Sequence, residues 1–103
     1  MSRIIRSAAF KRQLIEITTG YRTRAGSKTA LKFVDKVDVG IRFIVENPLA
    51  CAVHTRLENK EFRKWSLQDF PTSIFFRLDS DGTIILEALY AQRMNITARL
   101  PKA

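Results

Sequence analysis

The chain has 103 residues and a mass of 11.8 kDa, which is enough for one domain and too little for two ordinary ones. Its composition, 46% hydrophobic and 27% charged, is that of a globular protein and excludes a disordered or fibrous chain. Eighteen basic residues against 10 acidic ones give a formal charge of +8. This excess favours a polyanionic partner, such as nucleic acid, the ribosome or an acidic protein, although it is also compatible with a role in solubility alone.

Several classes of protein are disfavoured by what the sequence lacks. A single cysteine excludes an internal disulfide, and with one histidine it is too little for a zinc site, so we expect neither a metal nor a cofactor. No apolar run approaches the roughly 20 residues that span a bilayer. Basic residues also interrupt the N-terminal apolar stretch, which argues against a signal peptide. We therefore expect a cytoplasmic protein without a membrane partner.

The first half of the chain predicts a short strand followed by two helices. Residues 3–6 suit an opening strand, and Ser7 is placed to cap a helix over residues 8–23. Within this helix, apolar residues recur at spacings of four, three and four, which puts them on one face: Phe10, Leu14, Ile17 and Tyr21.

A second, longer helix is predicted from Ser27, which resembles a cap, to the pair Asn47-Pro48, where proline stops it. Its apolar stripe consists of Ala30, Phe33, Val34, Val37, Ile41, Ile44 and Val45. Gly40 lies inside this stripe and is unfavourable in a helix, so we interpret it as a point of close approach to another element. The two helices form a hairpin.

The second half of the chain has the short period of a sheet. Strands are predicted at 51–56, 62–67, 72–79 and 83–91, with a glycine-terminated turn at 79–82 joining the last two. These last two strands are apolar on nearly both faces and belong at the centre of the sheet. The fold class is therefore α+β: one domain, 1–103, with an N-terminal strand and a helical hairpin packed on one face of a mainly antiparallel sheet of four to five strands.

No catalytic triad or phosphate-binding glycine loop is present. Cys51 and His54 lie three residues apart, on one predicted strand, so we expect a buried thiol and an exposed imidazole on opposite faces. The remaining candidates are cations from neighbouring strands: Arg56, Arg63, Lys64, Arg77 and Arg93. Clustered on one face, they would hold a phosphodiester without a metal; the alternative is a solvated set of surface charges.

Strand parity limits such a cluster, because Arg63 and Lys64 are adjacent and point to opposite faces. Trp65 shares the parity of Arg63 and is expected in the core. Tyr90 and Arg93 come where the chain leaves its last strand, which makes them candidates for contact with a partner.

Residues 63–95 resemble the RelE/ParE toxins of type II toxin–antitoxin systems. The resemblance rests on a basic and bulky pair before Phe70-Pro71, an aromatic strand over 74–76, a turn, and a last strand ending near Arg93. The preceding helical hairpin and Asn47-Pro48 are also similar to this superfamily, so the resemblance covers nearly the whole chain. It implies a small growth inhibitor that a cognate antitoxin, acidic or amphipathic, wraps and neutralises in a hetero-oligomer.

The superfamily divides by target. RelE-like members cut messenger RNA on the ribosome with strand cations and a C-terminal tyrosine or histidine, whereas ParE-like members poison DNA gyrase and lack that set. Arg93 matches the late arginine of the nuclease pattern and Lys64 a strand lysine. Ser73, however, stands in place of the strand arginine, and Arg99 in place of the terminal tyrosine.

Phe70-Pro71 and the ending at 89–93 resemble ParE, whose members commonly have His-Gly in place of Tyr90-Ala91. We therefore expect a ParE-like toxin that binds a protein target such as gyrase and is not an enzyme, with Arg56, Arg77, Tyr90 and Arg93 as candidates for target or antitoxin binding.

Two alternatives stay open. The first is a ribosome-dependent mRNA endoribonuclease, with the ribosome and mRNA as partners and with Arg63, Lys64, Tyr90 and Arg93 as its catalytic residues. The second is an inactive basic interaction module.

Overall fold

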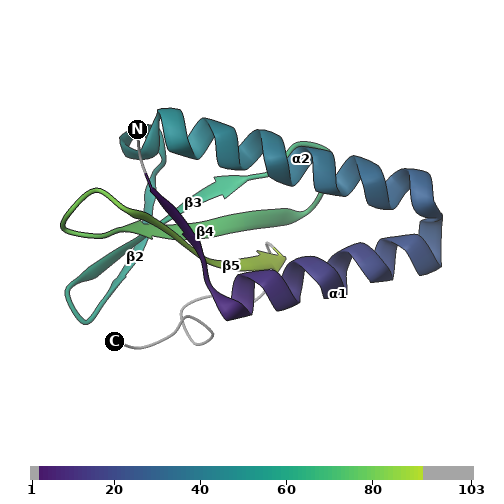
Figure 1. The fold of residues 1–103 in the computed structure, drawn as a ribbon, viewed down its shortest axis with the longest axis horizontal. Coiled ribbons are helices and arrows are strands. Elements are labelled where there is room, and N and C mark those ends of the chain that lie inside the picture. The colour runs from purple at the N-terminus through teal and green to yellow at the C-terminus, as the bar shows by residue number, and fades with distance from the viewer. Residues whose placement is uncertain (1–2, 92–103) are drawn as a thin grey trace.

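The computed structural model describes residues 3–91, and it has the predicted order of a strand, two helices and a meander of strands (Figure 1). The elements are β1 (Ile4–Arg6), α1 (Ala8–Ala25), α2 (Ser27–Glu46), a single 3₁₀ turn η1 (Pro48–Ala50), β2 (Val53–Leu57), β3 (Lys60–Ser66), β4 (Thr72–Leu78) and β5 (Ile84–Ala91). The sequence of residues 95–103 predicts either one helical turn or a loosely packed tail, and this segment lies outside the described residues. Among residues 3–91, neither helix is long and apolar enough to cross a membrane.

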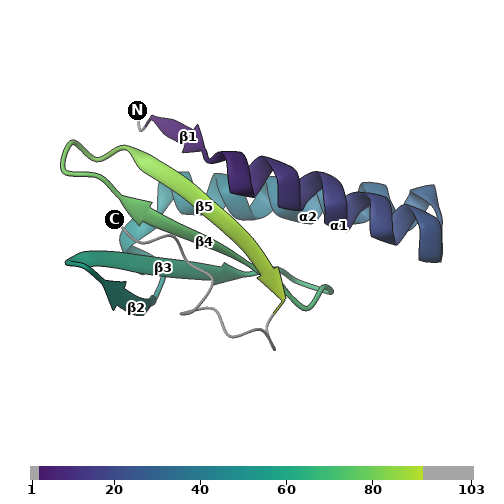
Figure 2. The same ribbon diagram turned by 90° about the horizontal axis from the view of Figure 1, so that it is seen from below.

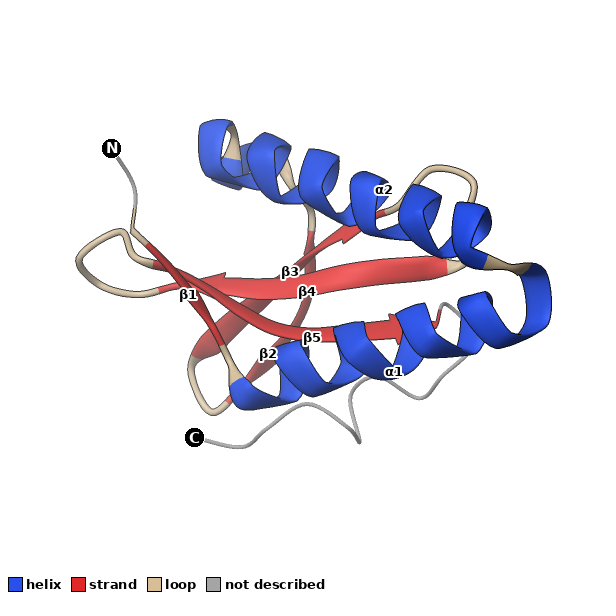
Figure 3. Cartoon of the chain, turned by 45° about the vertical axis from the view of Figure 1, so that its right-hand side comes forward, coloured by secondary structure: helices blue, strands red, loops and turns tan. Residues whose placement is uncertain are grey.

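The strands form one sheet in the order β1-β5-β4-β3-β2. Strands β2 to β5 pair antiparallel in sequence order, and β1 joins the far edge parallel to β5. Both helices pack on the same face of this sheet, side by side, and no helix of the described residues covers the other face (Figures 2 and 3). The predicted α+β class is confirmed.

The start of α1 is fixed by Ser7, as the sequence predicts. Its hydroxyl oxygen accepts a hydrogen bond from the backbone N–H of Phe10 at 3.0 Å, which satisfies one of the free donors of the first turn. The same hydroxyl donates to the backbone carbonyl of Glu87 on β5 at 2.8 Å. One side chain therefore both caps α1 and attaches it to the sheet.

The junction between the helices differs from the prediction. Ser27 is the first residue of α2 and not its cap, and α1 continues to Ala25. Gly26 takes both roles: its N–H donates to the carbonyl of Arg22, and its own carbonyl accepts from Ala30. Its φ of 92° is a conformation that glycine adopts without a steric penalty, so one residue ends α1 and begins α2.

The main core lies between the helices and the sheet. Phe10 and Phe33 of the helices pack into one cluster with Ile74 and Phe76 of β4, and all four are fully buried. Gly40 allows α2 to approach β3: a Cβ atom there would lie 2.7 Å from Cδ1 of Trp65. The close approach predicted for this glycine is confirmed.

A second, smaller apolar cluster lies on the opposite face of the sheet. It consists of Phe62, Phe75, Ala88 and Tyr90, with Leu57 packed against it. We refer to this side as the second sheet face. The two apolar faces explain why β4 and β5 are apolar at nearly every position.

The strand boundaries move by one or two residues from those predicted. β2 begins at Val53 because the 3₁₀ turn after α2 uses the preceding residues. β3 begins earlier, at Lys60, because Glu58 and Asn59 form a tight turn with φ values of 50° and 67°. The predicted turn at 79–82 is present, with Gly82 at a φ of 85°.

Candidate functional site

The predicted cations fall into two separate groups. Arg63 lies opposite Phe76, whose side chain belongs to the main core, whereas Lys64 lies opposite Phe75 of the second cluster. The predicted split of these two neighbours between the two faces is confirmed. Trp65 packs against the main core, as expected from its parity, and stacks on Phe43 at 4.2 Å between ring centroids.

The side chain of Arg63 bonds to groups of neighbouring segments of the chain. Its Nη1 donates to the backbone carbonyl of Cys51 at 2.7 Å, and its Nη2 lies 3.5 Å from a carboxylate oxygen of Glu61. The other oxygen of Glu61 accepts from Arg56 at 2.6 and 2.9 Å. Glu61 therefore neutralises part of the charge of both arginines.

Arg77 is paired in the same way. Its Nε donates to Glu87 at 3.0 Å, and its Nη1 lies 3.9 Å from Asp79. Glu87 is an extra residue in β5, since Phe75 pairs with Ala88 while Phe76 pairs with Leu86. This bulge gives the guanidinium a nearly buried carboxylate partner, with 11% of the Glu87 side chain exposed.

Three of the predicted arginines meet in one groove. A cavity of about 540 Å³ is lined by Arg56, Arg63 and Arg77 together with Lys60, Glu61, Asp79, Leu49, Leu78 and Asn59. The groove also contains two carboxylates that pair with its arginines, so its net positive charge is reduced. Neither Lys64 nor Tyr90 lines it.

Lys64 and Tyr90 belong instead to the second sheet face. The ring centroids of Tyr90 and Phe75 lie 5.8 Å apart, and those of Phe75 and His54 lie 5.2 Å apart in a T-shaped arrangement. His54 is exposed, yet its ring loses part of its water against Phe75. This partial burial, and secondarily the charge of Lys64, lowers the pKa of His54. Arg93, predicted beside Tyr90, lies outside the described residues.

Cys51 is a buried thiol with no catalytic geometry. It precedes β2 rather than lying on the same strand as His54, because the chain is still leaving the 3₁₀ turn at that point. The expected burial of the thiol and exposure of the imidazole are both confirmed. Burial raises the pKa of Cys51 and outweighs the opposite effect of Arg63, so the thiol is neutral and a poor nucleophile at neutral pH.

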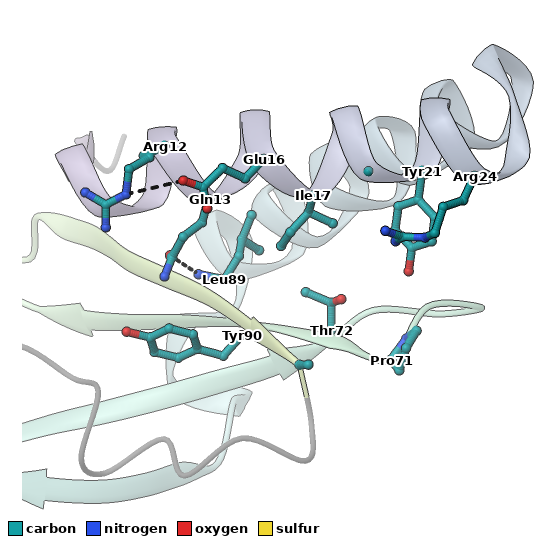
Figure 4. Close-up of a pocket in the computed structure, with 12 residues that line it drawn as sticks. Arg12, Gln13, Glu16, Ile17, Tyr21, Arg24, Pro71, Thr72, Leu89 and Tyr90 are labelled. Atoms are coloured by element: carbon teal, nitrogen blue, oxygen red, sulfur yellow. Dashed lines mark hydrogen bonds and ion pairs between the residues drawn. The ribbon is translucent and has the colours of Figure 1, made fainter.

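A further groove lies between α1 and the ends of β4 and β5 (Figure 4). It has a volume of about 520 Å³ and is lined by side chains of α1, including Arg12, Tyr21 and Arg24, and by Leu89 and Tyr90 of β5. Gln13 crosses from α1 to accept a hydrogen bond from the N–H of Leu89 at 2.9 Å. We refer to this cavity as the α1–β5 groove. Of the candidate site residues named from the sequence, Tyr90 is the only one that lines this groove in the described part of the chain.

Comparison with known proteins finds a similar structure but no match by sequence. No protein-family model matches the sequence, and no curated protein is found as a relative. Among solved structures, a chain from the "Chromosomal ParDE TA system from P. aeruginosa" superimposes with a TM-score of 0.75 at 17% identity. The match covers 88% of this chain and 96% of that one. The two share a fold.

Proposed function

We propose that the chain is the toxin of a type II toxin–antitoxin pair, a ParE-like growth inhibitor that acts by binding a protein target such as DNA gyrase. The sequence resemblance to the superfamily supports this proposal. The fold shared with a chain of a ParDE system also supports it, because the two structures superimpose over nearly all of both chains.

The observation that favours a binding toxin over a nuclease is that the cationic side chains do not gather on one face of the sheet. RNA cleavage without a metal requires several charged groups aimed at the same phosphodiester. Lys64 shares the second sheet face with Tyr90, whereas Arg63 points to the opposite side and is bound to Cys51 and Glu61. Arg77 is occupied by Glu87.

The proposal is tested in two steps. Induced expression of the chain is expected to stop growth, and the purified protein is expected to inhibit supercoiling by gyrase or to trap a cleavage complex. Growth arrest without any effect on gyrase would remove gyrase as the target, and undiminished growth would favour the inactive basic module.

A second candidate is the ribosome-dependent endoribonuclease, favoured by the shared face of Lys64 and Tyr90. Primer extension on translated messages would then show cuts in the ribosomal A site. These cuts would disappear in Lys64→Ala and Arg93→Ala. They would persist in Arg56→Ala, a matched control because the side-chain hydrogen bonds and the ion pair of Arg56 within the described residues are with Glu61. Intact messages would refute this candidate.

A further inference from the structure

The helical hairpin has one side packed on the sheet and an opposite side that no described element covers (Figure 2). Two apolar side chains are largely exposed on the hairpin: Ile15 of α1 at 67% and Leu31 of α2 at 65%. Leu31 lines a groove of about 270 Å³ between the two helices, together with Thr18 and Arg22. Arg22 and Leu31 are exposed, so this groove opens to solvent. We refer to it as the outer hairpin groove; it shares no lining residue with the α1–β5 groove.

The face of α1 beside this groove is basic. It consists of Lys11, Ile15, Thr18 and Arg22, whose spacings of four, three and four place them on one side of the helix. We refer to these four residues as the α1 stripe. Within residues 3–91, neither Lys11 nor Arg22 forms an ion pair. The α1 stripe therefore carries two positive charges that the described part of the chain does not neutralise.

The matching face of α2 is mainly acidic. It consists of Leu31, Asp35, Asp38 and Arg42, which recur at the same spacings, and all four are exposed. We refer to these four residues as the α2 stripe. Neither carboxylate lies within ion-pair distance of a basic group in the described part of the chain. Each stripe thus carries an exposed apolar residue and charges that are complementary to those of the other stripe.

The antiparallel arrangement of the helices makes the hairpin complementary to itself. A twofold axis along the hairpin places α1 of one copy across from α2 of a second copy, and the same contact then occurs twice. Arg22 and Leu31 line the same groove and so lie at similar heights. Lys11 comes eleven residues before Arg22, and Asp38 comes seven residues after Leu31. At 1.5 Å per residue, Lys11 and Asp38 are therefore about 6 Å apart in height, within reach of a lysine side chain.

We propose that the chain forms a symmetric dimer through the outer hairpin groove, in which the α1 stripe of each copy packs on the α2 stripe of the other. Ile15 and Leu31 of both copies form the apolar centre of this contact, and the basic groups of α1 meet the carboxylates of α2. The two sheets then lie on the outside of the dimer, so both copies of the second sheet face stay open to a partner. This inference does not depend on the proposed function.

Sedimentation equilibrium of the full chain measures the association. The formal charge of +8 on each copy opposes it at long range, so the experiment uses about 0.15 M salt, where the screening length is about 8 Å. The mean mass is expected to rise from 11.8 kDa towards twice that value as the protein concentration increases from about 1 to about 200 µM. A mass of 11.8 kDa at every concentration would refute the dimer.

The charged contact is tested by reversal. Asp38→Lys is expected to weaken dimerisation at least about tenfold, because it places like charges opposite each other at two equivalent points. Glu58→Lys is the matched control: it changes the net charge equally, in the exposed turn between β2 and β3. Adding Lys11→Asp to Asp38→Lys exchanges the two charges within one chain and is expected to restore dimerisation. Equal effects of Asp38→Lys and Glu58→Lys, or no recovery in the double variant, would refute the pairing of the two stripes.

The apolar contact is tested by two equivalent leucine substitutions. Leu31→Gln is expected to weaken dimerisation about tenfold, because it removes apolar area from the centre of the contact in both copies. Leu49→Gln is the control, since this leucine is 73% exposed in η1 and does not line the groove. Both side chains are largely exposed, so neither change removes a core contact. Equal affinity in the two variants would show that the copies associate through another surface.

Discussion

Replacing Gly40 by alanine tests the contact that positions α2 on the sheet. In an exposed helix this change stabilises by about 1 kcal/mol, because glycine loses more backbone entropy on folding. Here the new Cβ would lie 2.7 Å from Cδ1 and 2.9 Å from Nε1 of Trp65, and 2.9 Å from Cδ1 of Ile74. Trp65 is stacked on Phe43 and Ile74 is fully buried, so neither side chain moves away without disturbing others.

The two effects oppose each other. Overpacking of a core costs about 1–3 kcal/mol, so after the helical gain we expect Gly40→Ala to lose between about 0 and 2 kcal/mol. Gly20→Ala is the matched control, since that glycine is also inside a helix and its Cβ would meet only the flexible end of Arg24, at 3.1 Å. The control is expected to gain about 1 kcal/mol.

Urea unfolding followed by far-ultraviolet circular dichroism measures the difference in stability between the two variants. This signal does not depend on the fluorescence of Trp65, whose surroundings the substitution changes. We expect the two variants to differ by about 1–3 kcal/mol, with the higher midpoint in Gly20→Ala. The matching difference in Tm is at least about 4 °C. Equal stabilisation of both variants would show that α2 does not lie against Trp65 in solution.

Three other residues give direct tests. Ser7→Ala removes both the cap of α1 and the bond to Glu87, and is expected to destabilise by about 1–2 kcal/mol in the same unfolding assay, whereas Ser7→Asp retains most of the cap. Arg77→Met leaves the nearly buried Glu87 without its arginine and is expected to cost about 1–3 kcal/mol in the same assay. The pKa of His54 measured by NMR is expected to lie below the usual value of about 6.5 and to rise in Lys64→Met. An unchanged pKa in this variant would show that the charge of Lys64 does not act on His54. Because the unfolded chain binds this proton more readily, His54 is expected to make the fold slightly less stable as the pH falls through about 6.5.

The fold was predictable from the sequence because its signals are local. The apolar spacing from Phe10, the cap at Ser7 and the stop at Asn47-Pro48 each depend on a few neighbouring residues. Ser27 was wrongly predicted as a cap because serine is a common cap, and nothing in the sequence indicates that the backbone of Gly26 alone serves both helices.

The candidate site was only partly predictable because it depends on pairing between distant residues. Strand parity separates Arg63 from Lys64, and the structure agrees. The pairing of Arg77 with Glu87 follows from an extra residue in β5, which puts Leu86 and Ala88 on opposite faces. Because β5 is apolar on nearly both faces, this shift in alternation is not visible in the sequence. The α1–β5 groove was not predictable because it forms between α1 and strand ends that are far from it in the sequence, and because Gln13 bonds to backbone, which every residue type supplies.

The parallel pairing of β1 with β5 has a consequence for synthesis. β1 pairs with β5, the last of the described strands, and β5 is an interior strand of the sheet, so two partners far apart in the sequence must meet. While the chain is still growing, the helical hairpin has no completed sheet on which to bury its apolar stripe. Folding therefore waits for the C-terminal strand, and contacts between such distant residues form slowly. Until β5 has been made, a nascent chain of this topology exposes the apolar stripe of its helices and needs protection from aggregation.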